Sequence, residues 1–141
     1  MASAAIEDID DKPAARAILE YNRVDNKRNL KEKRELLVRI ARYLEPTLKD
    51  TDLKEPRKSL SDDINFALNN FNIRHNNDAG KSANVLLPEL TPQMLEIVYD
   101  DLYQAMLLFF EFEKYAPGSE RFVKLRKLLK ERTEEVKKKG V

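Results

Sequence analysis

The segment Asn69–Gly80, which reads NNFNIRHNNDAG, holds the residues of this chain that best suit chemistry on a phosphate group. It contains five asparagines and the only histidine of the chain. An arginine binds a phosphate through two parallel N–H donors, and a histidine gains or loses a proton near neutral pH. Arg74 followed by His75 therefore suits work on an RNA phosphodiester, in which the arginine stabilises charge and the histidine moves a proton.

A structural interpretation of the same residues is also open. Basic residues near the C-terminus of a helix interact favourably with its dipole, and asparagine-rich segments form turns. Under this interpretation Arg74 and His75 only end a helix. Under the functional one they are the catalytic candidates, and Asn72, Asn76 and Asn77 are candidates for binding the substrate, since amide side chains can bond base edges.

The segment RHNNDAG from Arg74 to Gly80 resembles the signature of HEPN domains, an arginine, a polar residue, three to five further residues and a histidine. Arg74 matches the arginine, and His75 matches the polar position. The resemblance covers Leu60–Tyr115 more loosely. It implies a small all-α domain of the kind found in abortive-infection, toxin–antitoxin and other RNA-targeting defence systems.

One position departs from that signature, because Ala79 stands where the resemblance implies the second histidine. In active members the arginine and histidine of two subunits meet in a dimer cleft that resembles a metal-independent ribonuclease site. Without the second histidine the general acid and base is missing. We therefore expect a domain that binds RNA or a protein partner through the Arg74-His75 loop without efficient cleavage, and whether it is an enzyme stays open.

A second polar group, Tyr99-Asp100-Asp101-Leu102-Tyr103, falls within a long apolar stretch. Two carboxylates beside tyrosines can bind a cation or accept buried hydrogen bonds, and Asp101 joins the candidates for binding the substrate. Adjacent residues on a helix point about 100° apart, which disfavours one shared metal site. Either aspartate could instead pair with Arg74 across the bundle. The structural alternative is that the tyrosines pack in the core and the aspartates face water.

Composition excludes several classes of site. The chain has 141 residues, no cysteine and one histidine, which excludes disulfides, cysteine-based zinc sites and histidine clusters within one chain. We predict no cofactor and no metal. The longest apolar run, Ala105–Phe110, is far shorter than the roughly 20 residues of a membrane span. The first ten residues resemble no secretory signal, so we expect a cytoplasmic protein that does not bind a membrane.

Apolar residues recur at helical spacing, which predicts an all-α fold, an up-and-down bundle of four to five helices. Residues 1–11 are expected to form a flexible N-terminus and residues 12–141 a single domain. The predicted helices run from Pro13 to about Asn22, from Leu30 to Leu44 or slightly beyond, from Ser59 or Ser61 to about Phe71, from Pro92 to Pro117, and from Glu120 onward. Asp11, Thr91 and Ser119 are the expected caps of the first, fourth and fifth helices.

The fourth helix is apolar on most sides, so it is expected to be the centre of the bundle or to meet a second subunit. We predict a homodimer through this helix. In the last helix the apolar residues Phe122, Leu125, Leu128, Leu129 and Val136 are expected to face inward. Two further hypotheses are a small helical interaction protein without a nucleic-acid role, such as an immunity protein or adaptor, and an enzyme that uses Asp100 and Asp101 with a metal.

Overall fold

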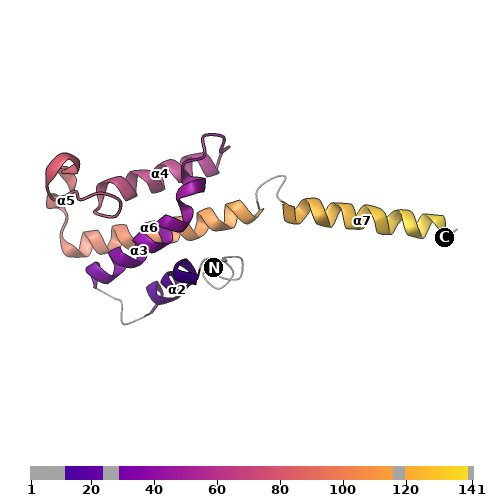
Figure 1. Ribbon diagram of the computed structural model, residues 1–141, viewed down its shortest axis with the longest axis horizontal. Helices are drawn as coiled ribbons and strands as arrows, with labels where there is room; N and C mark the ends of the chain where they lie inside the picture. Colours follow the sequence, from indigo (N-terminus) through magenta and orange to yellow (C-terminus); the bar gives the residue numbers. More distant parts are fainter. Residues whose placement is uncertain (1–11, 24–28, 116–119, 140–141) are drawn as a thin grey trace. The chain divides into compact units, whose positions relative to one another are not determined.

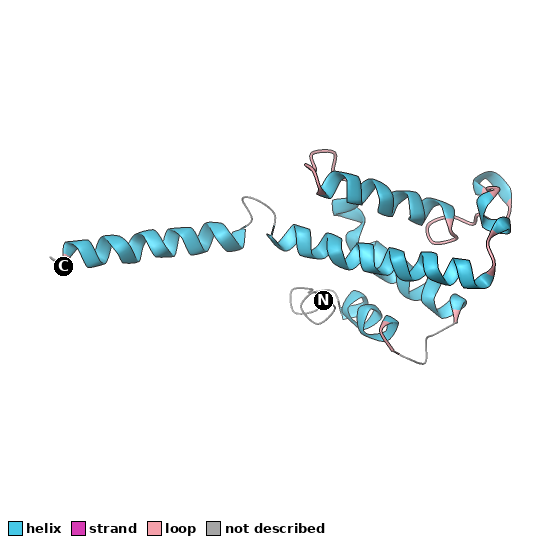
Figure 2. Ribbon diagram, turned by 180° about the vertical axis from the view of Figure 1, so that it is seen from behind, coloured by secondary structure: helices cyan, strands magenta, loops and turns pink. Residues whose placement is uncertain are grey.

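The structure is a computed structural model that describes residues 12–23, 29–115 and 120–139. Every regular element within these ranges is a helix, and Figure 2 shows no strand among them. The predicted all-α class is therefore confirmed. The elements in chain order are α2 (Lys12–Tyr21), α3 (Leu30–Leu48), α4 (Arg57–Asn70), the 3-10 turn η2 (Gly80–Ser82), the short α5 (Leu86–Glu89), α6 (Pro92–Tyr115) and α7 (Glu120–Lys138) (Figure 1).

The chain divides into two units, Met1–Phe109 and Phe110–Val141. The first unit holds α2 to α5 and most of α6, and the second holds the end of α6 and α7. The expected single domain over residues 12–141 stays a prediction. The expected flexible N-terminus and the expected caps Asp11 and Ser119 lie outside the described residues.

Helix α6 lies at the centre of the first unit, which is one of the two positions expected for the fourth predicted helix. Its Tyr103 hydroxyl donates a hydrogen bond to the carbonyl of Ile18 on α2 at 2.9 Å, and its Tyr99 hydroxyl donates to the carbonyl of Phe71 at 2.9 Å. In Figures 1 and 2 α4 lies on one side of α6 and α2 on the other. The two buried tyrosines therefore join α6 to the helices on either side of it.

The apolar stripes predicted for the first helices form the core. On α2 the apolar residues at helical spacing, Ala14, Ala17, Ile18 and Tyr21, are all buried, and the Tyr21 ring stacks on that of Tyr103 with 4.1 Å between the ring centroids. On α3 the residues at helical spacing, Leu37, Ile40, Ala41, Leu44 and Leu48, are buried, as are Leu36 and, unexpectedly, Lys33. Helical spacing alone was sufficient to find these residues because each stripe faces a neighbouring helix.

Helix α3 ends slightly beyond Leu44, as the sequence allowed, whereas the predicted start of α4 was wrong. Helix α3 continues through Pro46 to Leu48, since Leu44 and Leu48 both lie on the buried stripe and their packing outweighs the hydrogen bond that proline removes. Helix α4 begins at Arg57, so Ser61 lies inside it and does not cap it. The buried Ser61 hydroxyl instead donates to the carbonyl of Leu48 at 3.2 Å, which satisfies an orphan acceptor at the end of α3.

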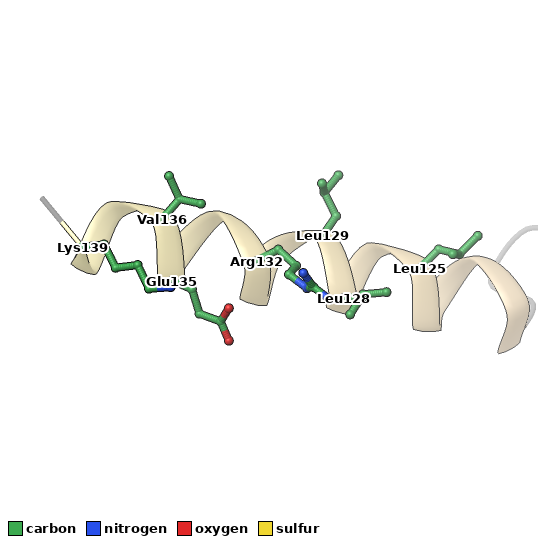
Figure 3. Close-up of a pocket in the computed structure, with 7 residues that line it drawn as sticks. All are labelled: Leu125, Leu128, Leu129, Arg132, Glu135, Val136 and Lys139. Atoms are coloured by element: carbon green, nitrogen blue, oxygen red, sulfur yellow. The ribbon is translucent and has the colours of Figure 1, made fainter. Parts of the chain in front are cut away.

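The predicted start of α6 is confirmed. The hydroxyl oxygen of Thr91 accepts a hydrogen bond from the backbone N–H of Met94 at 3.2 Å, and Pro92 occupies the first helical position. In α7, by contrast, the apolar residues expected to face inward are 44 to 69% exposed. The second unit by itself therefore leaves this stripe uncovered (Figure 3), and the expected burial of the stripe against the rest of the bundle stays a prediction.

Candidate functional site

The loop that follows α4 is folded by its asparagines. Asn72 has a φ of 62°, a left-handed conformation that asparagine tolerates better than most residues and that ends the helix. The backbone N–H of Asn72 donates to Oδ1 of Asn77 at 2.8 Å, and the backbone N–H of Asn77 donates to Oδ1 of Asn72 at 2.6 Å. These reciprocal bonds close the loop on itself.

Asn77 is the centre of this loop and is only 1% exposed. Its side-chain amide donates to the carbonyls of Asn69 at 2.8 Å and Ser82 at 2.7 Å. Asn76 is exposed, and its Oδ1 accepts from the backbone N–H of Asp78 at 3.0 Å. Of the three asparagines predicted to bind a substrate, the structure thus brings Asn72 and Asn77 together inside the loop and leaves Asn76 at the surface.

Arg74 ties the loop to two helices. Its Nε and Nη2 donate to Oε1 of Glu45 on α3 at 2.9 and 2.6 Å. Its Nη1 donates to Oδ1 of Asn69 at 2.8 Å, and Nη2 donates to Oδ1 of Asn65 at 3.0 Å. These four hydrogen bonds engage most of the five N–H donors of the guanidinium, so little of the arginine is left for a ligand.

The Arg74 side chain is 24% exposed, and that of Glu45 is 25% exposed. An ion pair at this depth, with both guanidinium edges bonded, holds the loop in one position on α3 and α4. Glu45 is the carboxylate next to Arg74, and Asp100 is bound to Lys33. The predicted pairing of Arg74 with Asp100 or Asp101 was therefore wrong.

His75 follows Arg74 in the chain, but its side chain lies at the surface. The residue is exposed, and its side chain forms no hydrogen bond or ion pair with the part of the chain that the structure describes. Ala79 is exposed as well. The loop thus presents an imidazole to solvent beside a guanidinium that is engaged in the protein.

An arginine-rich surface lies beside the loop, formed by Arg34, Arg39 and Arg42 of α3 together with Arg74. Two adjoining open hollows of about 180 and 360 Å³ share Arg42 and the apolar residues Val38 and Ile73. The lining of the two hollows includes these four arginines and only two carboxylates, those of Glu35 and Glu45.

The four arginines of this arginine surface differ in what they bind. Nε of Arg34 donates to the carbonyl of Asn72 and so fastens the loop to α3. Arg39 and Arg42 are exposed and have no ion-pair partner among the described residues. Two guanidinium groups are therefore available beside this loop, and guanidinium groups bind carboxylate and phosphate through paired hydrogen bonds.

A partly buried polar cluster around Lys33 of α3 was not predicted from the sequence. Nζ of Lys33, whose side chain is 5% exposed, lies 2.8 Å from Oδ1 of Asp100 and 3.7 Å from Oε1 of Glu96. The Tyr21 hydroxyl donates to the same oxygen of Asp100 at 2.8 Å. Its burial could have been predicted, because Lys33 lies three residues after Leu30 and four before Leu37, on the apolar stripe itself.

Burial raises the pKa values of three tyrosine hydroxyls in the first unit. It raises the pKa of Tyr99 and the pKa of Tyr103 to about 12 each. The pKa of Tyr21 is raised further, by burial first and then by its hydrogen bond to the Asp100 carboxylate. All three phenols are therefore neutral donors at physiological pH, with structural roles.

Asp101 lies away from the loop. It is exposed and borders an apolar hollow of about 250 Å³ between α4 and α6, which Phe66, Val98 and Ala105 also line. Within the described ranges no three or more His, Cys, Asp or Glu side chains gather as a metal ion would require. None of the described helices has both the length and the apolar composition of a membrane span.

Comparison of the chain with protein-family models, with curated proteins and with solved structures finds no match.

Proposed function

We propose that this chain is a cytoplasmic HEPN-like helical domain that binds RNA through the arginine surface and does not cleave it efficiently. The observation that carries the proposal is the pair of adjoining hollows whose lining includes four arginines and only two glutamates. Arginine recognises phosphate through paired N–H donors, and the phosphate backbone supplies most of the affinity for nucleic acid. The defence setting comes from the sequence resemblance alone.

The proposed role of each arginine depends on how many of its N–H donors are free to bind a phosphate. Arg39 and Arg42 would contact phosphates, because both are exposed and carry no ion-pair partner among the described residues. Arg74 would act as a positioning residue, since Glu45 and two asparagines engage most of its donors. His75 and Asn76 are exposed on the same loop, where they can reach a base or a sugar.

Binding is tested with a fluorescently labelled single-stranded RNA and the double variant Arg39→Gln, Arg42→Gln. We expect about a tenfold loss of affinity near physiological salt, and a decrease of about 1.4 in the steepness of log K against log salt concentration, because each single-strand phosphate contact contributes about 0.7 to that slope. Fluorescence anisotropy at several salt concentrations gives both quantities.

The matched control is Lys54→Gln, Lys58→Gln, which removes the same charge from exposed residues that line neither hollow. We expect it to leave both affinity and slope nearly unchanged. Equal losses in the two double variants would mean that net charge, rather than this surface, holds the RNA. Absence of measurable RNA binding by the wild type would remove the proposal.

Cleavage is tested separately, on the same labelled RNA. With Ala79 in place of the second histidine, we expect the wild type and His75→Ala to leave the RNA equally intact on a denaturing gel. Cleavage by the wild type that His75→Ala abolishes would show that His75 does supply a general acid or base, and the non-catalytic part of the proposal would fall.

The apolar hollow between α4 and α6 favours a second candidate function, a helical protein–protein interaction module. Phe66 is 54% exposed at this hollow, and Asp63 and Asp101 line it as well. An apolar groove with carboxylates suits the apolar face of a basic helix. If the wild type binds no RNA but retains one protein partner, and Phe66→Ala releases that partner, the second candidate holds.

A further inference from the structure

The two adjoining hollows of the arginine surface differ in what lines them. The smaller hollow, of about 180 Å³, has aliphatic walls that come from α3, α4 and the loop, namely Val38, Ala41, Leu68 and Ile73. Leu68 is fully buried, and Ala41 and Ile73 are each 6% exposed, so close packing between the two helices and the loop fixes the floor of this hollow. The smaller hollow therefore offers a rigid apolar surface.

The polar residues that complete the smaller hollow are Arg42, Glu45 and Arg74. Glu45 and Arg74 bond each other at 2.6 Å, which leaves the pair close to neutral as a unit. Arg42 is exposed, has no ion-pair partner among the described residues, and lines the larger hollow as well. The free positive charge of the smaller hollow thus lies on the side where the larger one begins.

The larger hollow, of about 360 Å³, carries most of the charge. Arg34, Arg39 and Arg42 line it, with Glu35 as its carboxylate. Arg39 and Arg42 are three residues apart on α3, so they are neighbours on one face with roughly 5–6 Å between their Cβ atoms. Two free guanidinium groups at this spacing suit a phosphate, which accepts paired hydrogen bonds from arginine.

An apolar hollow beside a phosphate-binding one matches the two parts of a nucleotide. Pockets that hold a whole drug-sized ligand measure about 300–1,000 Å³, so the smaller hollow has room for one planar ring system and for little more. A base has apolar faces that stack on side chains or on a guanidinium plane, but only where it is not already paired and stacked in a duplex. The ligand that fits both hollows is therefore a nucleotide with an unpaired base.

We propose that the arginine surface binds one nucleotide, with its unpaired base in the smaller hollow and its phosphate on Arg39 and Arg42. The site so defined rests on the RNA binding proposed above and adds a class of substrate, a single strand with one base turned out of the stack. A free nucleotide has the same chemistry, so the experiments below separate the two sources.

Removing the bases from the ligand tests the smaller hollow without any change to the protein. Fluorescence anisotropy compares a labelled oligoadenylate with a labelled abasic strand that carries the same number of phosphates. We expect the abasic strand to bind at least about fivefold more weakly, which is the lower end of what one stacked base contributes. Equal affinity for the two strands would overturn the base site and leave the proposed RNA binding intact.

Narrowing the smaller hollow tests where the base lies. Ala41→Leu adds bulk to its wall and leaves Arg39 and Arg42 in place, so the variant should lose the preference for bases and keep its affinity for the abasic strand. Ala67→Leu is the matched control, because the half-buried Ala67 lines the hollow between α4 and α6 instead, and it should keep the preference. Circular dichroism checks that both variants fold. A preference that survives in folded Ala41→Leu would contradict the assigned site, and if that variant does not fold, the comparison of the two strands decides.

Calorimetric titration with adenosine 5′-monophosphate separates a free nucleotide from a strand. If the wild type binds it, and both Ala41→Leu and the double variant Arg39→Gln, Arg42→Gln bind it more weakly, the site accepts a free nucleotide. That result in a chain that binds no RNA would support the nucleotide site and remove the proposed RNA function. A chain that prefers oligoadenylate to the abasic strand and does not bind the monophosphate takes its nucleotide from a strand. Binding of neither ligand would remove both proposals.

Discussion

Replacing Asp100 by asparagine removes the carboxylate that neutralises a buried lysine. The two partners differ sharply in exposure: the Lys33 side chain is 5% exposed, and that of Asp100 is 47% exposed. In Asp100→Asn the ammonium group stays buried, with only the Glu96 carboxylate at 3.7 Å beside it. In the opposite variant, Lys33→Met, the remaining carboxylate is half in water and can be solvated.

This difference in burial sets the expected magnitudes. Breaking a fully buried ion pair by removing one partner costs about 3–5 kcal/mol, and the Glu96 carboxylate together with the half-exposed position of Asp100 reduces this to about 2 kcal/mol for Asp100→Asn. Lys33→Met keeps an unbranched apolar chain of similar length in the core. We expect it to cost less than about 1 kcal/mol.

Urea unfolding followed by circular dichroism at 222 nm measures the difference. With a slope of about 1.5 kcal/mol per molar urea, Asp100→Asn should lower the midpoint by about 1.3 M, and Lys33→Met by less than half of that. Asp101→Asn is the matched control, because the neighbouring aspartate is exposed and should stay within about 0.5 kcal/mol of the wild type. If Lys33→Met or Asp101→Asn lowers the urea midpoint as much as Asp100→Asn does, the loss of stability in Asp100→Asn does not come from an unpaired buried lysine.

Three further predictions concern the tyrosines and the loop. Burial raises the pKa of Tyr99 and of Tyr103 to about 12 in the folded state, against 10 when unfolded, so the folded state holds these protons more tightly. Their contribution to stability is full below pH 10, and stability should fall between pH 10 and 12 by about 1.4 kcal/mol per pH unit for each tyrosine. A melting temperature that stays constant over that range would contradict this. Asn77→Ala should lower the free energy of unfolding in urea by about 2–3 kcal/mol, because it leaves several buried backbone groups unpaired. The control Asn76→Ala should change that free energy by less than about 0.5 kcal/mol. Equal effects of the two variants would contradict the roles assigned to Asn77 and Asn76. Gly80→Ala should lower the free energy of unfolding by about 1 kcal/mol through backbone strain alone, since φ is 80° and nothing lies within 4 Å of the added methyl group. An unchanged melting temperature would mean that the turn adopts another conformation.

The helices and their buried faces were largely predictable because helix periodicity and capping are local properties. The stripe of α2 and the Thr91 cap of α6 are both as expected. The errors fall where a distant segment changed a local preference. Ser61 has the side chain of a cap, but the carbonyl of Leu48 lies beside it, so it bonds there and α4 starts earlier.

The candidate site was predicted only in part. The asparagine-rich stretch was expected to be a loop beside the end of a helix, and it is one. The arginine surface was not expected, since Arg39 and Arg42 resemble ordinary charges on the solvent face of α3. Only the loop that packs beside them, with Ile73 between, turns them into the lining of two hollows.

The sequence by itself determined that the chain is helical, where most helices lie, and which apolar residues of α2 and α3 are buried, because these follow from contacts within a few residues. The tertiary structure alone decided which charges are neutralised. Lys33 finds Asp100 67 residues away, and Arg74 finds Glu45 29 residues away. Helical spacing brings together only charges three or four residues apart, so it does not encode the distance between side chains this far apart in the chain.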